Sequence, residues 1–354
     1  MQMKSLSFIV RLLYVVPFAL LGIACNETEE AAHIGPPPPS ECPTVDPTNS
    51  CGNVCRGYPP LNDLGSDLWR GRQGGLYPGG QNVRPAAHDA AGLAIASQIQ
   101  PLDVSGAPDA VNGKIVLISM GMSNTAMEFD RFIPMFEALP TRNPQVALVN
   151  CAQGGWEINH FLDMSVSEDY WQNVDSFFAE QGLSYQQVQV IWFKQAELGP
   201  EIIAPDTSFI GYVAYLKEKF KQTMNILSEK FPNAKICYAS SRIYAGYGVD
   251  NGNPEPFAYY TGWAVKDLIE EQINGDPGLI YEGAGRNSPW LSWGPYLWAD
   301  GLKPRSDGLI WICPDDYLPD GRHPSDPVGR MKVATMLRDF LISDETAQPW
   351  FVVN

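Results

Sequence analysis

Short apolar runs that alternate with stretches of helical periodicity are the feature that most constrains the fold. The runs are Ile115–Ser119, Val146–Asn150, Val188–Phe193, Ile236–Ala239 and Leu309–Cys313. They are rich in Val and Ile and lack strict alternation of apolar and polar residues. That pattern is typical of strands that are covered on both faces of a parallel sheet.

Three segments around these runs have the spacing of amphipathic helices. Apolar residues recur at intervals of three and four from Phe209 to Leu227 and again from Val328 to Leu337, and Tyr170–Gln181 ends at Gly182. Alternating strands and helices predict an α/β protein. We expect a doubly wound, flavodoxin-like three-layer α/β/α sandwich whose central parallel sheet has about five strands. Ligands of such sheets bind beyond the carboxyl ends of the strands, so the residues that follow each run are the candidates for function.

Residues whose side chains or backbone groups could take part in catalysis or binding follow the first three runs. Ser123 stands where the first run should turn into a helix, which would raise its hydroxyl above the sheet. The pair Gly154-Gly155 follows the second run, and glycines let a backbone N–H approach a ligand closely. Gln195 follows the third run, and its side chain could donate a hydrogen bond to an oxyanion. Taken singly, these residues are equally compatible with a helix cap, a tight turn and a surface amide.

A further motif, Asp320-Gly-Arg-His323-Pro, precedes the last predicted helix. A carboxylate three residues before a histidine can accept its Nδ1 proton and leave Nε2 as a base. The chain has 4 histidines, and only His323 has an acid at this spacing in such a loop. By itself the motif is also compatible with a local hydrogen bond of no catalytic role.

The order of these motifs resembles the SGNH (GDSL-like) hydrolase family. The resemblance implies that Ser123 is the nucleophile, that His323 is the base and then the acid, and that Asp320 orients His323. It further implies an oxyanion hole made of the Ser123 amide, the Gly155 amide and the Gln195 side chain. No metal or organic cofactor is implied.

The resemblance extends over about residues 114–338 and includes two departures. Met122 stands where family members commonly carry Asp, and Gln195 stands where many carry Asn. Gln in this position, with the glycine pair, is similar to the branch that includes sialate and other carbohydrate O-acetylesterases. The family therefore implies ester hydrolysis through an acyl-enzyme, with an O-acetyl group on carbohydrate as the favoured substrate.

Four further residues are candidate substrate contacts: Asn124, Arg242, Tyr244 and Trp293. Aromatic faces stack on sugar rings, and an arginine could hold a carboxylate or hydroxyl groups. The tryptophans between residues 290 and 298 are also compatible with core packing under a loop.

Two alternatives to a carbohydrate esterase remain open at the level of sequence. The chain could be a surface glycan-binding lipoprotein that kept the fold and lost the reaction. It could instead keep the triad and act on lipid or aryl esters, or transfer acyl groups to sugars. Pocket shape and water access separate these possibilities, and neither can be read from the sequence.

The first residues predict export. Residues 1–24 combine a positive start with an apolar stretch of about a dozen residues and a small-residue exit, which is typical of a signal peptide. Cys25 could become a lipidated N-terminus, giving a bacterial cell-envelope lipoprotein at the outer membrane or the surface; otherwise the protein is secreted. Residues 25–60 are rich in Pro and contain Cys, as in a linker. Residues 61–354 are then the hydrolase domain.

Net charge bears on the expected partners, and the cysteines bear on disulfides and metal sites. A net charge of −16 gives no electrostatic footprint for nucleic acid. The family resemblance implies a small-molecule or polysaccharide ester as the partner. A membrane is expected only through the lipid anchor, and the oligomeric state is left open. We expect one disulfide among Cys42, Cys51 and Cys55. The remaining cysteines, Cys151, Cys237 and Cys313, are expected to be free and buried, and no metal site is expected.

Overall fold

The computed structural model describes residue 51, residues 55–248 and residues 250–353. The predicted signal peptide, Cys25 and most of the predicted linker lie outside the described residues. No helix in the described part of the chain has both the length and the apolar character needed to cross a membrane.

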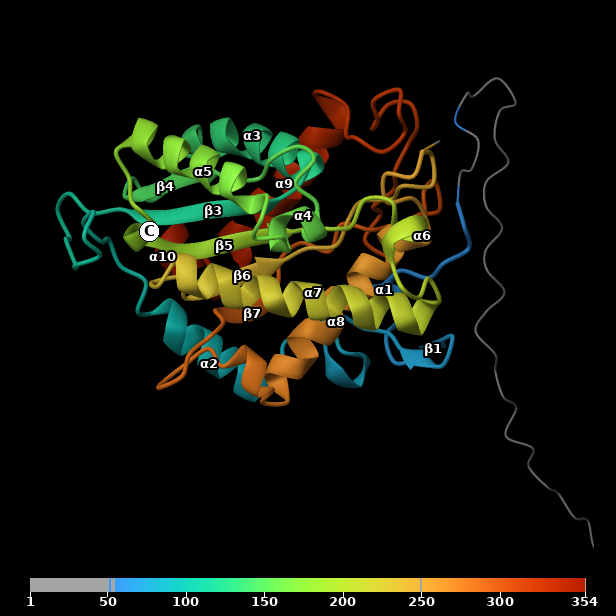
Figure 1. The fold of residues 1–354 in the computed structure, drawn as a ribbon, viewed down its shortest axis with the longest axis horizontal. Coiled ribbons are helices and arrows are strands. Elements are labelled where there is room, and N and C mark those ends of the chain that lie inside the picture. Colours follow the sequence, from blue (N-terminus) through green and yellow to red (C-terminus); the bar gives the residue numbers. More distant parts are fainter. Residues whose placement is uncertain (1–50, 52–54, 249, 354) are drawn as a thin grey trace, which may run out of the picture. The chain divides into compact units, whose positions relative to one another are not determined.

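The core of the protein is a parallel sheet of five strands in the order β4-β3-β5-β6-β7 (Figure 1). The strands are β3 (Ile115–Gly121), β4 (Val146–Asn150), β5 (Val188–Lys194), β6 (Ile236–Ala239) and β7 (Trp290–Trp293). The first strand of this sheet along the chain is β3. The next strand, β4, pairs with one side of β3, and β5, β6 and β7 follow one another on the opposite side. This reversal of direction defines a doubly wound sheet of the flavodoxin type. The predicted fold class is confirmed.

One face of the sheet is covered by α3 (Ser123–Glu137) and α9 (Val328–Ser343). Trp192 of β5 stacks on Phe129 of α3, and Tyr238 of β6 packs edge-on against Phe340 of α9. Trp192 and Tyr238 are partners in the β5–β6 register, so they point to the same face. The two helices also pack against each other.

The opposite face is covered by α5 (Ser167–Gln181), α7 (Phe209–Lys230) and α8 (Phe257–Ile273). Phe193, the neighbour of Trp192, points to this face and packs against Phe220 of α7. Tyr170 of α5 donates a hydrogen bond to the sulfur of Met120 in β3 at 3.3 Å. These two helical layers on one buried sheet give the three-layer α/β/α sandwich.

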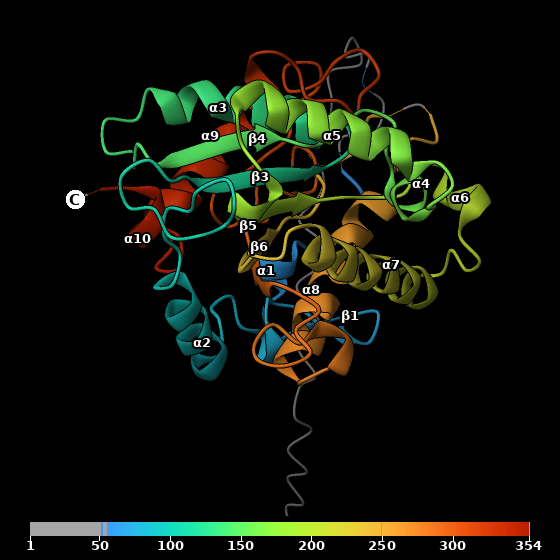
Figure 2. The same cartoon turned by 60° about the vertical axis from the view of Figure 1, so that its left-hand side comes forward.

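Shorter elements complete the domain. They are helices α1 (Leu61–Leu64), α2 (Ala86–Ala96), α4 (Ile158–Leu162), α6 (Pro200–Ile203) and α10 (Gln348–Phe351), the strand pair β1 (Leu68–Trp69) and β2 (Arg72–Gln73), and 3₁₀ turns at Pro78–Gly80, Tyr185–Gln187 and Pro277–Leu279. Helix α2, at the lower left of Figure 2, packs beside the edge strand β7. Its His88 ring stacks on Trp290, and His88 Nε2 lies 2.8 Å from the Leu291 carbonyl.

The predicted helices are confirmed within a few residues at each end. Helix α7 begins after Ser208, whose hydroxyl accepts a hydrogen bond from Gly211 N at 3.2 Å and so caps the helix. Helix α5 ends at Gly182 in the left-handed conformation, as the sequence predicted. Helix α9 begins directly after Pro327.

The prediction of a strand at Leu309–Cys313 was wrong. This segment is a loop, and the fifth strand is Trp290–Trp293, which pairs with β6 in the register Ile236↔Trp290 to Ala239↔Trp293. All four residues of β7 are buried. The aromatic residues of β7 do not resemble the Val- and Ile-rich pattern of the other strands, whereas Leu309–Cys313 is apolar because Trp311 is buried in the core.

The disulfide prediction also needs a correction. Cys51 pairs with Cys313, 262 residues further along the chain. Cys313 is therefore not a free thiol. Cys55 is disulfide-bonded as well, and Cys42 lies outside the described residues. Cys151 and Cys237 are free and buried, as predicted, and burial raises the pKa of both thiols.

Candidate active site

The carboxyl ends of the parallel strands bring the candidate residues to one edge of the sheet. In the β3–β5 register Gly121 lies opposite Lys194, and in the β5–β6 register Phe193 lies opposite Ala239. The segments that follow these strands therefore start side by side.

The turn between β3 and α3 presents Ser123. Ser123 is the first residue of α3, and only Met122 separates it from the strand. A Cβ on Gly121 would lie 2.1 Å from the Lys194 carbonyl oxygen, so only glycine allows the two strand ends to approach this closely. Thr125 Oγ1 donates to the same carbonyl at 2.7 Å and fixes the first turn of the helix.

Ser123, His323 and Asp320 form a hydrogen-bonded chain. His323 Nε2 lies 2.7 Å from Ser123 Oγ, although the two residues are 200 positions apart in the sequence. His323 Nδ1 forms a short hydrogen bond with Asp320 Oδ2. Burial raises the pKa of Asp320, but its hydrogen bonds from His323 and Arg322 outweigh burial and leave that pKa below its usual range. A carboxylate that stays ionised favours the imidazole tautomer with a proton on Nδ1 and an acceptor at Nε2.

The loop that carries Asp320 and His323 is held in a tight turn. Asp320 Oδ1 accepts hydrogen bonds from the backbone of Arg322 at 3.1 Å and of His323 at 3.0 Å. Gly321 has φ +68°, and a Cβ there would lie 2.3 Å from the Tyr247 carbonyl oxygen. The turn thus requires glycine both for its conformation and for its close packing.

The glycine pair after β4 lies next to Ser123. Gln153 N donates to the Gly121 carbonyl at 3.0 Å, which holds the loop against the end of β3. A Cβ on Gly154 would lie 3.8 Å from Ser123 Cβ, whereas a Cβ on Gly155 would meet no atom within 4 Å. Within the described part of the chain, the backbone N–H groups of Ser123, Gly154 and Gly155 donate no hydrogen bond. They are therefore available to a ligand.

Gln195 is nearly buried and is already hydrogen-bonded within the protein. Its Nε2 donates to the Trp156 carbonyl at 2.9 Å, and its Oε1 accepts from Ala196 N at 2.9 Å. The side chain therefore ties the loop after β5 to the loop after β4. One hydrogen of the amide remains for any other acceptor.

Two of the candidate substrate contacts have structural partners. Asn124 is 2% exposed, and its Nδ2 donates to the Arg322 carbonyl at 3.0 Å. Tyr244 is fully buried, and its ring packs against Tyr247 and Trp298. Asn124 thus positions the loop that carries His323, and Tyr244 belongs to the core.

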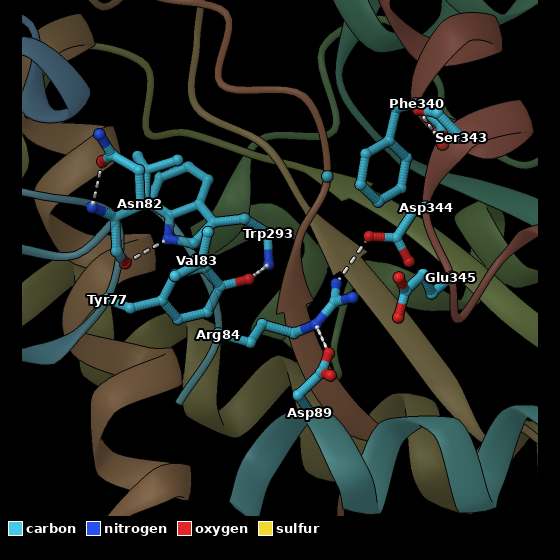
Figure 3. A pocket seen from close by; sticks show the side chains of 12 residues that line it. Tyr77, Asn82, Val83, Arg84, Asp89, Trp293, Phe340, Ser343, Asp344 and Glu345 are labelled. Carbon is cyan, nitrogen blue, oxygen red and sulfur yellow. Dashed lines mark hydrogen bonds and ion pairs between the residues drawn. The ribbon is translucent and has the colours of Figure 1, made fainter. Parts of the chain in front are cut away.

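Trp293 lies in a different environment from the triad. It lines a cavity of about 460 Å³ together with Tyr77, Arg84 and Asp344 (Figure 3). Its Nε1 donates to the Leu76 carbonyl at 2.7 Å, and Arg84 bridges two carboxylates across the cavity. None of the three triad residues lines this cavity. The structure therefore does not bring Trp293 together with Ser123.

Arg242, the fourth candidate, follows β6 at the carboxyl edge of the sheet. It is 4% exposed, and its Nε is buried without a hydrogen-bond partner. Burial lowers the pKa of its guanidinium, and the charges that act on it most strongly include Glu128 of α3 and Arg322 of the triad loop. Two of the charges that act on Arg242 therefore come from α3, which begins at Ser123, and from the loop that carries His323.

Sequence reasoning missed a buried ion pair between β5 and α3, the helix that begins at Ser123. Lys194, the last residue of β5, binds both carboxylate oxygens of Glu128 on α3. The side chains of both residues are at most 1% exposed. Desolvation raises the pKa of Glu128 and lowers that of Lys194 to about 8, although each charge opposes the shift of the other. The sequence signal was a lysine that directly follows the apolar residues Val190–Phe193.

The described residues contain no group of three or more His, Cys, Asp or Glu side chains arranged to hold a metal ion. The chemical groups assembled at the sheet edge are a hydroxyl, an imidazole, a carboxylate and unpaired backbone amides. Such a set can activate a hydroxyl as a nucleophile and bind an oxyanion.

No protein-family model matches the sequence, and no curated protein matches it. Similar solved structures include a protein named as a GDSL-like lipase from Parabacteroides merdae, with 14% identity, a TM-score of 0.38, and coverage of 64% of this chain and 95% of that chain. A protein named as an acylhydrolase from Bacteroides fragilis has 11% identity and a TM-score of 0.38, with coverage of 75% and 100%. A protein from Arabidopsis thaliana has 13% identity and a TM-score of 0.32, with coverage of 61% and 67%.

Proposed function

We propose that the protein is a serine ester hydrolase of the SGNH type. The observation that carries this proposal is the hydrogen bond of 2.7 Å between Ser123 Oγ and His323 Nε2, with Asp320 bound to the other ring nitrogen. Ser123 and His323 are 200 positions apart in the sequence. They meet at the edge of the sheet where ligands of this fold class bind.

In the proposed reaction Ser123 Oγ attacks the carbonyl carbon of the ester while His323 Nε2 takes the hydroxyl proton. The tetrahedral intermediate collapses when His323 returns that proton to the leaving alcohol, which leaves an acyl group on Ser123. A water molecule then attacks the acyl carbon while His323 takes its proton. The bond from the acyl carbon to Ser123 Oγ breaks, His323 returns the proton to Ser123 Oγ, and the carboxylic acid is released. Asp320 keeps the proton on His323 Nδ1 throughout and stabilises the imidazolium.

The oxyanion of each tetrahedral intermediate would be bound by backbone N–H groups. Ser123 N and the N–H groups of the glycine pair are unpaired in the described chain, and Gly154 lies close to the Ser123 side chain. The second Nε2 hydrogen of Gln195 would add a donor. Each donor of this kind contributes about 3 kcal/mol to lowering the barrier.

We further propose an O-acetyl group on a carbohydrate as the ester. The support is the similarity of the Gln195 block and the glycine pair to carbohydrate O-acetylesterases. Export also fits, because polysaccharides lie outside the cytosol. Lipid and aryl esters, and acyl transfer to a sugar, are outcomes that a substrate screen would separate.

Export itself remains a proposal that two observations support. Residues 1–24 have the pattern of a signal peptide, and the Cys51–Cys313 disulfide is of a kind that persists in oxidising compartments. Cys25 is the proposed lipidation site. Metabolic labelling with a radioactive fatty acid tests it: we expect label on the wild-type protein and none on a Cys25→Ser variant. A protein that is secreted without label would remove the anchor from the proposal.

The test of the reaction is hydrolysis of p-nitrophenyl acetate by purified residues 25–354. We expect turnover by the wild-type protein and by the control Ser97→Ala, because Ser97 is exposed and directly follows α2, outside the site. Ser123→Ala should lose turnover to background. A fluorophosphonate probe should label the wild-type protein and leave Ser123→Ala unlabelled. Turnover that survives in Ser123→Ala would contradict the assignment of the nucleophile.

A further inference from the structure

Arg242 carries a buried charge that the carboxylates of Glu128 and Glu255 offset without direct contact. Within the described residues its guanidinium forms neither a hydrogen bond nor an ion pair, and its Nε is buried. Burying an unpaired charge is costly, and proteins rarely do so without a reason. The side chain is 4% exposed, so bulk water solvates little of it.

The carboxylates that act on Arg242 are already occupied. Glu128 binds Lys194 with both oxygens. Glu255 accepts hydrogen bonds from Trp298 Nε1 at 2.8 Å and from two backbone N–H groups at 3.0 Å. Neither carboxylate has a contact with Arg242, so the guanidinium keeps its donors for another partner.

A second guanidinium near Arg242 belongs to Arg322, which unlike Arg242 is ion-paired, with Asp250 and, through Nε at 3.7 Å, with Asp320. The charge of Arg322 acts on Arg242, and Arg322 Nε is also buried without a hydrogen-bond partner. Arg322 is one residue from His323, and its Nη2 lies 3.2 Å from Asp250. Its main chain is tied to α3 by the bond from Asn124. The guanidinium of Arg242 is thus without a hydrogen bond in the described part of the chain, and its charge interacts with α3, which begins at Ser123, and with the loop that carries His323.

We propose that Arg242, with Arg322 beside it, forms a subsite for a carboxylate of the substrate. The inference rests on the proposed esterase function and narrows its substrate class to esters that carry a carboxylate near the scissile bond. The guanidinium fork matches a carboxylate in geometry and keeps its charge at any working pH. The net charge of −16 makes the molecule as a whole repel anions, so an anionic substrate needs a local cation of this kind.

The carboxylate could belong to either half of the ester, and two matched pairs of substrates distinguish the sources. A mono-O-acetylated methyl glucuronoside and the corresponding methyl glucoside differ only in the C6 carboxylate, on the alcohol side. The p-nitrophenyl esters of succinate and of butyrate differ in a carboxylate on the acyl side. For each pair the measurement is the ratio of kcat/KM for the acidic and the neutral ester, with a correction for uncatalysed hydrolysis.

We expect one of the two pairs to show a preference for the acid of about tenfold or more, which is the usual effect of a charge-assisted hydrogen bond. Arg242→Gln should bring that ratio close to one, and Arg242→Lys should restore part of it. The control is Arg286→Gln, which removes a half-buried guanidinium bound to the carbonyls of Pro232 and Ala234 and should leave the ratio unchanged. Ratios near one for both pairs, or a ratio that Arg242→Gln does not change, would overturn the proposal.

Two further measurements keep the inference testable if a variant or the reaction fails. If Arg242→Gln does not fold, inhibition of p-nitrophenyl acetate turnover is measured on the wild-type protein: succinate or methyl glucuronoside should inhibit at least about tenfold better than its neutral counterpart. If no ester is hydrolysed, calorimetric binding of the same acids to the wild-type protein decides. Binding that prefers the acid would retain the subsite without the esterase, and equal or absent binding would remove both.

Discussion

Asn124 donates a hydrogen bond from Nδ2 to the backbone carbonyl of Arg322 at 3.0 Å. The residue after the predicted nucleophile is thereby joined to the residue before the predicted base. The side chain of Asn124 is buried, so water does not compete for this bond. The bond fixes the distance between α3 and the Asp320–His323 loop, on which the contact of Ser123 Oγ with His323 Nε2 depends.

Loss of this bond should impair catalysis more than folding. We expect Asn124→Ala to lower kcat by about tenfold to a hundredfold, because small misplacements of a catalytic group have effects of this size. The free energy of unfolding should fall by only about 1–2 kcal/mol. Asn233→Ala is the matched control, since Asn233 Nδ2 also donates to a backbone carbonyl, at 2.7 Å, on an exposed part of the surface. A kcat for Asn124→Ala equal to that of the control would contradict this positioning role.

The Lys194–Glu128 pair should be sensitive to the loss of either partner. Lys194→Met leaves a buried carboxylate, and Glu128→Gln leaves a buried ammonium group, so we expect each variant to lose about 3–5 kcal/mol of unfolding free energy. The double variant removes both charges and should be more stable than either single variant. Urea unfolding of the four proteins measures this coupling. Additive losses in the double variant would show that the two charges do not interact.

Glu255 should make stability depend on pH. Burial raises its pKa from 4.5 to about 7, against the opposing effect of its three hydrogen bonds. Between these values the folded state holds a proton that the unfolded state has released, so the contribution of Glu255 to stability falls as pH rises through this window. The loss is on the order of 3 kcal/mol. We therefore expect the stability difference between the wild-type protein and Glu255→Gln to decrease from pH 5 to pH 8 in urea unfolding. A difference that is the same at both pH values would refute the shift.

The Cys51–Cys313 disulfide should contribute strongly to stability because it closes a very long loop. Its partners are 262 residues apart, and cross-links of long loops restrict the unfolded chain most. Cys51→Ala and Cys313→Ala should each lower the free energy of unfolding by about 2–5 kcal/mol. The double variant should lose no more than the single variants do, because each removes the same bond. Additive losses would mean that the two side chains stabilise the fold through separate contacts.

Local sequence patterns were sufficient to predict the fold class and four of the five strands of the sheet. Val- and Ile-rich runs, helical spacing and strand-end residues are short-range signals, and a parallel sheet collects its strand ends at one edge. The strand Trp290–Trp293 was not predicted from the sequence. Its two indole rings are buried by α2 and by loops of the domain, and such tertiary packing leaves no local sequence signal. Leu309–Cys313 has a strand-like sequence but lies in a loop outside the sheet. Its apolar character reflects the burial of Trp311 in the core.

Long-range pairings could not be predicted for a different reason. The Cys51–Cys313 bond, the Asn124–Arg322 bond and the Lys194–Glu128 pair each join segments whose separation in the sequence carries no signal of contact. A single lysine at the end of an apolar run can be recognised as unusual, but its partner cannot be named. The family resemblance, by contrast, led us to expect that distant residues come together. It rested on the order of four motifs in the sequence: Ser123, the glycine pair, Gln195 and Asp320-x-x-His323.

The disulfide also divides the chain into a covalent ring and a tail. Residues 51–313 form the ring, which contains the strands of the sheet and Ser123, whereas Asp320, His323 and α9 belong to the tail. No cysteine follows Cys313 in the sequence. A single proteolytic cut inside the ring therefore leaves both fragments joined through sulfur. A single cut between Cys313 and Asp320 instead breaks the covalent link between the tail, which carries His323, and the ring, which carries Ser123.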